Sequence, residues 1–150
     1  MGRIYSIPYT GTVTNSGGNA DLLELLPADD KPIRLRGFII GQISEVGDTA
    51  EEGLDISIIR MAATVTGSNG TAVTPVPVDS ADAAAGFTAE CNGATVATTS
   101  GASTVVANMG WNERMSPFDF WFPDERFCPK AKQGEGLFVR MNTTPADDFT

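Results

Sequence analysis

Short runs of β-forming residues recur along this chain, and clusters of glycine, proline, asparagine and aspartate separate them. Runs of this length suit strands and are too short for stable helices. We therefore predict an all-β fold, a jelly-roll-like antiparallel β-sandwich of about eight or nine strands with long loops. The expected strands cover residues 3–14, 21–26, 33–40, 54–65, 85–91, 94–99, 103–109, 118–122 and 137–141.

Three of these runs carry more specific signals. In 33–40 an alternating pattern ends in consecutive apolar residues, which predicts a strand that begins half exposed and ends covered on both faces. In 54–65 the adjacent pair Ile58-Ile59 breaks the alternation, which predicts a central strand with a bulge or a second covering layer. The run at 21–26 resembles a helix start, but six residues before a proline favour a strand.

The segments between the runs favour turns. Residues 66–79 predict an extended, exposed loop, and alanines after Ser80 predict a short helical turn that ends at Gly86. The tetrapeptide PADD occurs at 27–30 and again at 145–148. Proline suits the second position of a turn and aspartate can bond nearby amides, so turn chemistry explains the repeat without a ligand.

The bulk composition bounds the classes of protein to consider. A length of 150 residues predicts one domain over 1–150, with 1–19 as an extended N-terminal arm in which Tyr5, Ile7 and Tyr9 share a face. The formal net charge of −9 disfavours nucleic acid as a partner. No apolar run is long enough for a membrane span or has the form of a secretory signal, so we expect neither a membrane partner nor secretion.

The residue types that carry most catalytic chemistry are scarce. The chain has no histidine, which excludes Ser-His-Asp triads and Cys-His dyads. Cys91 and Cys128 belong to no metal-binding spacing, and two buried free thiols are favoured over a disulfide. We expect no cofactor and no enzymatic activity.

The densest group of carboxylates lies at 44–55 and comprises Glu45, Asp48, Glu51, Glu52 and Asp55. Calcium binds such oxygen atoms, but the spacing does not match an EF-hand loop. A glycosidase needs two carboxylates across a sugar, and sequence neighbours such as Glu51 and Glu52 do not provide that geometry. A solvated loop between two strands is therefore favoured, and a hydrolase that uses Glu51 or Glu52 is the weakest alternative.

The segment 110–127 is rich in aromatic residues. Alternation places Phe118, Phe120 and Phe122 on the core face and leaves Trp121 on the other face. An outward tryptophan near arginines is typical of a protein interface or a sugar platform, although a second layer could also cover it. The interface candidates are Trp121, Arg114 and Arg126, with Tyr5 and Tyr9 of the N-terminal arm as a second group.

Three stretches, GFIIGQISEVGDTAEEGLDISIIRM, DSADAAAGFTAECNGATVATT and QGEGLFVRMNTTPADD, together resemble a family of small structural proteins of tailed bacteriophages, of the head decoration or cement type. The resemblance covers roughly residues 20–150 and carries no catalytic signature. It implies a virion protein with a jelly-roll-like β-sandwich, assembled in the host bacterial cytoplasm. Members often continue into one more strand and an acidic tail, and Phe149-Thr150 have the character of a strand start, so we expect the chain to continue.

These observations predict a non-enzymatic capsid decoration or cement protein. Its expected partners are copies of itself, in a homo-oligomer such as a trimer, and the major capsid protein or other virion proteins. The alternative is a tail-associated or fibre-associated module that binds carbohydrate through Trp121.

Overall fold

A computed structural model describes residues 2–14, 19–43, 52–63, 65–114 and 117–150. Within these residues the chain forms fourteen strands and one 3-10 turn, with no α-helix. The all-β prediction is confirmed. The strands are β1 (Tyr5–Ser6), β2 (Ala20–Pro27), β3 (Ile33–Arg34), β4 (Gly37–Ile40), β5 (Gly53–Ala62), β6 (Val65–Ser68), β7 (Thr71–Val73), β8 (Val76–Pro77), β9 (Phe87–Gly93), β10 (Thr95–Thr99), β11 (Ser103–Asn112), β12 (Phe118–Trp121), β13 (Lys130–Ala131) and β14 (Glu135–Met141), and the turn is η1 (Glu125–Phe127).

One antiparallel sheet of six strands forms the centre of the molecule, in the order β11-β5-β14-β2-β9-β7. Strands β5 and β14 lie inside this sheet, and their residues are mostly buried on both faces. This two-sided burial explains their nearly continuous apolar sequences. The run at 21–26, which resembled a helix start, is strand β2.

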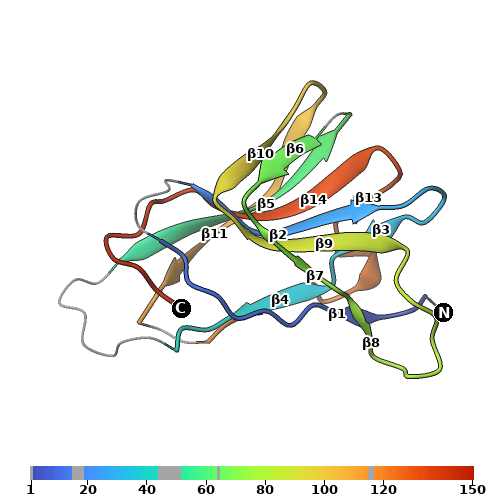
Figure 1. The fold of residues 1–150 in the computed structure, drawn as a ribbon, viewed down its shortest axis with the longest axis horizontal. Helices are drawn as coiled ribbons and strands as arrows, with labels where there is room; N and C mark the ends of the chain where they lie inside the picture. Colours follow the sequence, from blue (N-terminus) through green and yellow to red (C-terminus); the bar gives the residue numbers. More distant parts are fainter. Residues whose placement is uncertain (1, 15–18, 44–51, 64, 115–116) are drawn as a thin grey trace.

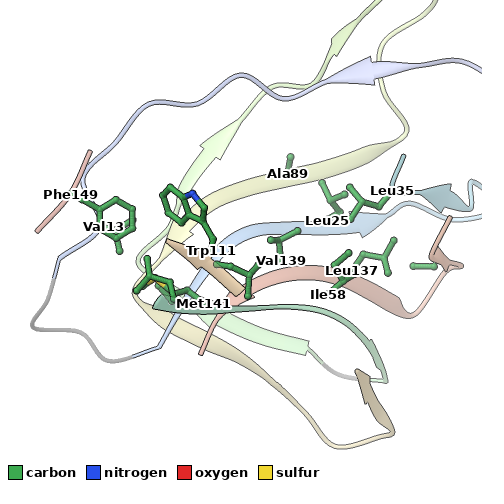
Figure 2. Packing of buried hydrophobic residues seen from close by; sticks show 14 residues of the cluster. Val13, Leu25, Leu35, Ile58, Ala89, Trp111, Leu137, Val139, Met141 and Phe149 are labelled. Atoms are coloured by element: carbon green, nitrogen blue, oxygen red, sulfur yellow. The ribbon is translucent and has the colours of Figure 1, made fainter. Parts of the chain in front are cut away.

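A second layer of two strand pairs, β1–β8 and β4–β12, covers one face of the six-stranded sheet (Figure 1). Its inward side chains, among them Ile7, Phe38 and Phe120, pack on the main core of the protein. The chain therefore forms an antiparallel β-sandwich, as predicted; the jelly-roll order of strands stays a prediction. Figure 2 shows part of this core, where Phe149 meets Trp111 with their ring centroids 5.9 Å apart.

The strand pair β6–β10 covers the opposite face of the sheet (Figure 1). Beneath it lies a smaller core, to which β5 contributes Ile59 and Met61. Ile58, the neighbour of Ile59, points instead into the main core. A bulge lies opposite this pair, because β11 carries one additional residue, Val106. The second covering layer predicted from the Ile58-Ile59 pair is therefore confirmed, whereas the predicted bulge in this strand is wrong, because β5 pairs with β14 without a register shift and the additional residue belongs to β11.

An ion pair inside the protein fastens β10 to the sheet. The guanidinium of Arg140 on β14 donates to both carboxylate oxygens of Asp21 on β2, at 2.6 and 3.0 Å. Asp21 also accepts from the backbone N–H of Ala97, and Arg140 donates to the Ala97 carbonyl oxygen. The side chains of Asp21 and Arg140 are only 2% and 12% exposed. We call this three-residue arrangement the Asp21–Arg140 clamp.

The predicted strand at 33–40 is wrong as a single element. It divides into β3, which pairs with β13, and β4, which pairs with β12. Its end is not covered on both faces either, because Ile39 is 59% exposed. The two strands separate because Leu35 and Arg36 between them bond to different neighbours: the Leu35 N–H donates to the Pro129 carbonyl, and the Arg36 carbonyl accepts from Phe122.

Two predicted connections also differ from the structure. The expected exposed loop at 66–79 contains most of β6 and all of β7 and β8. The expected helical turn capped by Ser80 is absent from the described residues; a single turn begins instead at Asp79, whose carboxylate accepts from the N–H of Ala81 and whose carbonyl accepts from Asp82. These strands were missed because each is short and gains its partner from a distant part of the chain.

The two PADD copies have different roles. In the first copy the predicted turn is confirmed, but it closes between Ala28 and Lys31, so Pro27 ends β2 instead of taking the second turn position. Asp30 adopts a left-handed φ of 57° there. In the second copy the N–H of Ala146 donates to the carboxylate of Glu52. The repeated sequence therefore does not mark a repeated site.

The clamp generates a prediction about stability. Replacement Arg140→Met leaves the Asp21 carboxylate buried without its cation, so we expect the free energy of unfolding to fall by about 3 to 5 kcal/mol. The double replacement Asp21→Leu with Arg140→Met removes both charges and should recover much of this loss. Urea unfolding at neutral pH measures both values.

The matched control is Arg34→Met, which breaks the exposed ion pair between Arg34 and Glu125. An exposed pair contributes at most about 1 kcal/mol, so this variant should unfold almost as the unchanged protein does. Equal losses for Arg140→Met and Arg34→Met would contradict the role of the clamp.

Candidate interaction surface

The outward face of the β4–β12 pair is apolar. Trp121 is 56% exposed and lies over Gly37, its cross-strand partner. A Cβ atom at Gly37 would come within 2.6 Å of the indole ring, so glycine is required for this close approach. Ile39, two residues along β4 on the same face, is exposed to a similar degree. The predicted inward Phe118 and Phe120 and outward Trp121 are confirmed.

The outward face of the β1–β8 pair has the same character. Ile4 and Val78 are joined by a backbone hydrogen bond, and Val76 pairs with Ser6. The three apolar side chains are all exposed, with Val78 at 66%. We define the outer apolar face as Ile4, Ile39, Val76, Val78 and Trp121.

The two predicted arginines lie at different places near β12. Arg126 is exposed in η1 and bonds Asp124 through both its backbone N–H and its guanidinium. These hydrogen bonds, together with the nearby charge of Arg36, hold the pKa of Asp124 below its usual value. Arg114 is also exposed and lines a small hollow of about 380 Å³ together with Asp119. The structure therefore places both arginines at the surface.

The two predicted tyrosines of the N-terminal arm differ in environment. Tyr5 is half-buried: its ring packs edge-to-face on Phe87, and its hydroxyl donates to the Ala83 carbonyl at 2.9 Å. Its aromatic ring thus anchors the arm to its own domain. Tyr9 is 36% exposed and folds back over Gly11. Of the two, Tyr9 is the more exposed.

A cleft of about 1480 Å³ lies between the six-stranded sheet and the second layer. Its apolar lining includes Leu23 and Leu25 of β2, Cys91 of β9 and Val139 of β14. Burial, followed by the charge of Glu90, raises the pKa of the Cys91 thiol to about 11. Cys91 is therefore a protonated, weakly nucleophilic residue of the cleft floor. Both cysteines are buried and free, as predicted.

Two carboxylates, Glu24 and Glu90, face each other across β2 and β9 on the sheet face that carries β6 and β10. Burial raises the pKa of Glu24, and the negative charges of Glu90 and Asp21 raise it further, against the opposing effect of Arg140. Like charges directly opposite one another in a sheet are destabilising. The Glu24–Glu90 pair is therefore a local weakness of the sheet.

The predicted acidic loop falls mostly outside the described residues. Glu45, Asp48 and Glu51 lie there, whereas Glu52 bonds Ala146 and Asp55 accepts from Asn142. In the part of the chain that the structure describes, no three carboxylates, cysteines or histidines gather to hold a metal ion.

No family model, curated protein or solved structure matches this chain. Among the described residues, no helix has the length and apolar character that a membrane crossing requires.

Most of the outer apolar face and the cleft were not predicted from the sequence. Ile39 belonged to a run that was expected to be covered, and Val76 belonged to an expected loop. The alternation of Ile4 with Tyr5 and Ile7 contained a usable signal, because it places Ile4 on the outward side of the arm. The cleft depends on how distant segments pack, and no local pattern indicates it.

The like-charged pair predicts a pH-dependent stability. The pKa of Glu24 is raised in the folded protein, so protonation of Glu24 favours folding. This contribution to the free energy of unfolding is complete below the ordinary pKa of 4.5 and is lost as pH rises through the folded pKa. We expect Glu24→Gln to raise the free energy of unfolding by about 0.5 to 1 kcal/mol at pH 7 and to change nothing at pH 4. Thermal or urea unfolding at the two pH values measures the difference.

Glu90→Gln should give a similar gain at pH 7, and the double variant should add little to either single one, because one replacement already removes the repulsion. Asp119→Asn, a change at an exposed carboxylate, is the control. A gain from Glu24→Gln that persists at pH 4 would show that charge is not its cause.

Proposed function

We propose that this protein is a non-enzymatic structural component of a bacteriophage virion, a decoration or cement protein that binds the head shell and further copies of itself. The observation that carries the proposal is the outer apolar face. Exposed apolar side chains that gather on one layer of a protein are typical of a contact with another protein. Under this proposal the β-sandwich is a rigid platform that presents the outer apolar face.

The position of the outer apolar face supports binding through buried area. Ile4, Ile39 and Trp121 project from paired strands whose opposite sides pack on the core, so little conformational freedom is lost when a partner covers them. Tryptophan and arginine are also the residue types that most often dominate the binding energy of protein interfaces. Arg126 supplies this polar edge next to β12.

A second candidate function follows from Trp121 alone. An exposed indole on a flat strand pair is also suited to stacking against a sugar ring, so the alternative is a tail-associated or fibre-associated carbohydrate-binding module. A carbohydrate platform would use Trp121 with nearby polar groups and would leave Ile4 and Val78 exposed. The two proposals therefore differ in how much of the outer apolar face is covered.

The shell-binding proposal predicts an effect of Trp121→Ala. Phage shells that lack this protein should bind the unchanged chain, and the variant should bind at least tenfold more weakly because a central aromatic contact is lost. Co-sedimentation of purified protein with shells measures the affinity. Ile39→Ser should weaken binding as well, although by a smaller factor.

Val105→Ser is the matched control, because Val105 is equally exposed but lies on β11 at the edge of the six-stranded sheet. Equal binding by all variants would contradict the proposed surface. Saturable binding of the unchanged chain to glycans on an array, abolished by Trp121→Ala, would instead favour the carbohydrate module.

A further inference from the structure

The second layer has an open slot between its two strand pairs. Strand β1 pairs only with β8, and β4 pairs only with β12, among the residues that the structure describes. The segments facing the slot, residues 2–11 on one side and 36–41 on the other, both line the cleft of about 1480 Å³. The slot is therefore the opening of this cleft toward solvent.

At one end of the slot, the backbone of Phe149 and Thr150 already lies between the two flanks. Val13 and Phe149 exchange two backbone hydrogen bonds, of 2.7 and 3.0 Å, in an antiparallel bridge. On the other side, the N–H of Ile43 donates to the carbonyl oxygen of Thr150 at 2.6 Å. One extended strand thus fits between the two flanks at this end, bonded to both of them.

The direction of the backbone groups along the arm continues this pattern. The Ile4 carbonyl and the Ser6 backbone bond to the β8 side. The backbone N–H and C=O groups of even-numbered residues therefore point away from the slot. Val13, an odd-numbered residue, points into it. In an extended strand the backbone groups alternate, which directs those of residues 5, 7, 9 and 11 into the slot. Pro8, which has no N–H, falls among the even positions and costs the slot no donor.

The same alternation holds on the other flank. The Arg36 carbonyl bonds to Phe122 on the β12 side, whereas the Ile43 N–H points into the slot. The backbone groups of residues 37, 39 and 41 therefore face the slot as well. Both flanks present rows of donors and acceptors without a strand partner in the described residues, and an apolar small molecule could not satisfy these groups.

Charge gathers at the far end of the slot, where β1 and β4 begin. The cleft lining includes five of the ten cationic side chains of the chain but only one of its nineteen carboxylates, Glu125, which is paired with Arg34. Arg3 precedes β1, and Lys31, Arg34 and Arg36 precede β4. The fifth cation, Lys130, lies on β13 and pairs with β3. Two of these cations already form ion pairs, Arg3 with Asp82 and Arg34 with Glu125. Lys31, Arg36 and Lys130 therefore carry the excess positive charge of this rim, which favours an acidic group at that end in a protein of net charge −9.

We propose that the slot is an acceptor site for one extended strand donated by another polypeptide chain. The donated strand runs antiparallel to both β1 and β4, places apolar side chains at alternate positions into the cleft, and carries carboxylates where it meets the cationic rim. This is strand addition to a sheet, here with two edges bonded at once. The inference does not rest on the proposed function, since the slot geometry is the same in any assembly.

The probe is an eight-residue peptide of alternating valine and threonine that ends in two glutamates. About seven residues span the slot at roughly 3.3 Å per residue. We expect saturable binding by calorimetry, with slowed hydrogen exchange at the amides of Tyr5, Ile7, Gly11 and Ile39. The amide of Thr10, which points away from the slot, should exchange at an unchanged rate.

Two altered peptides test the two parts of the recognition. N-methylation at alternate residues removes backbone donors and should weaken binding at least tenfold. Replacing the terminal glutamates with lysines should weaken binding by a similar factor at low salt. A chain that carries the eight residues joined after Thr150 should show the same exchange pattern without peptide and should no longer bind it.

Changes at the rim provide the matched variants. Arg36→Gln with Lys130→Gln should weaken binding of the glutamate peptide by about two- to fivefold per charge, whereas Lys132→Gln, exposed and outside the cleft lining, should not. Equal binding of the N-methylated peptide, or protection of Thr10 together with Tyr5 and Gly11, would overturn strand addition. No binding of any peptide would overturn the slot as an acceptor, while shell binding through Trp121 would remain open to its own test.

Discussion

The buried contact between Asp21 and Arg140 holds β10 on the six-stranded sheet, to which no hydrogen-bonded ladder joins it in the described residues. It joins β2 to β14 inside the sheet and holds β10 above it through the Ala97 backbone. No buried side-chain nitrogen or oxygen atom in the described residues lacks a hydrogen-bond partner. The clamp lies on the sheet face that carries β10, and the cleft lies on the opposite face.

That division gives the two faces of the molecule different roles. The face with β6 and β10 is closed by a small core and by polar bonds, and the repulsion between Glu24 and Glu90 weakens it. The other face combines an apolar exterior, an internal cleft and a cationic rim. Both proposals concern this second face: the outer apolar face offers area to a partner, and the slot offers backbone groups. A single partner could therefore engage side chains and main chain together.

Local patterns were sufficient for the longer strands and for Trp121, because alternation along one strand decides which side chains point inward. They were insufficient wherever structure depends on distant pairing. The division of 33–40 follows from bonds to Pro129 and Phe122, and Asp21 meets a partner 119 positions away. The cationic rim could not be predicted from local patterns either. Lys31, Arg34 and Arg36 are close in sequence, but they line the same cleft as Arg3 and Lys130 only after folding.

Strand β11 forms one of the two edges of the six-stranded sheet. Residues 103–110 form an edge strand without a single charge, a composition that ordinarily invites uncontrolled association. The additional residue Val106 interrupts the ladder near the middle of that strand and increases its local twist. A strand of a neighbouring molecule can then form a regular hydrogen-bonded ladder with only half of β11 at a time. A bulge of this kind disfavours edge-to-edge pairing between copies of a protein.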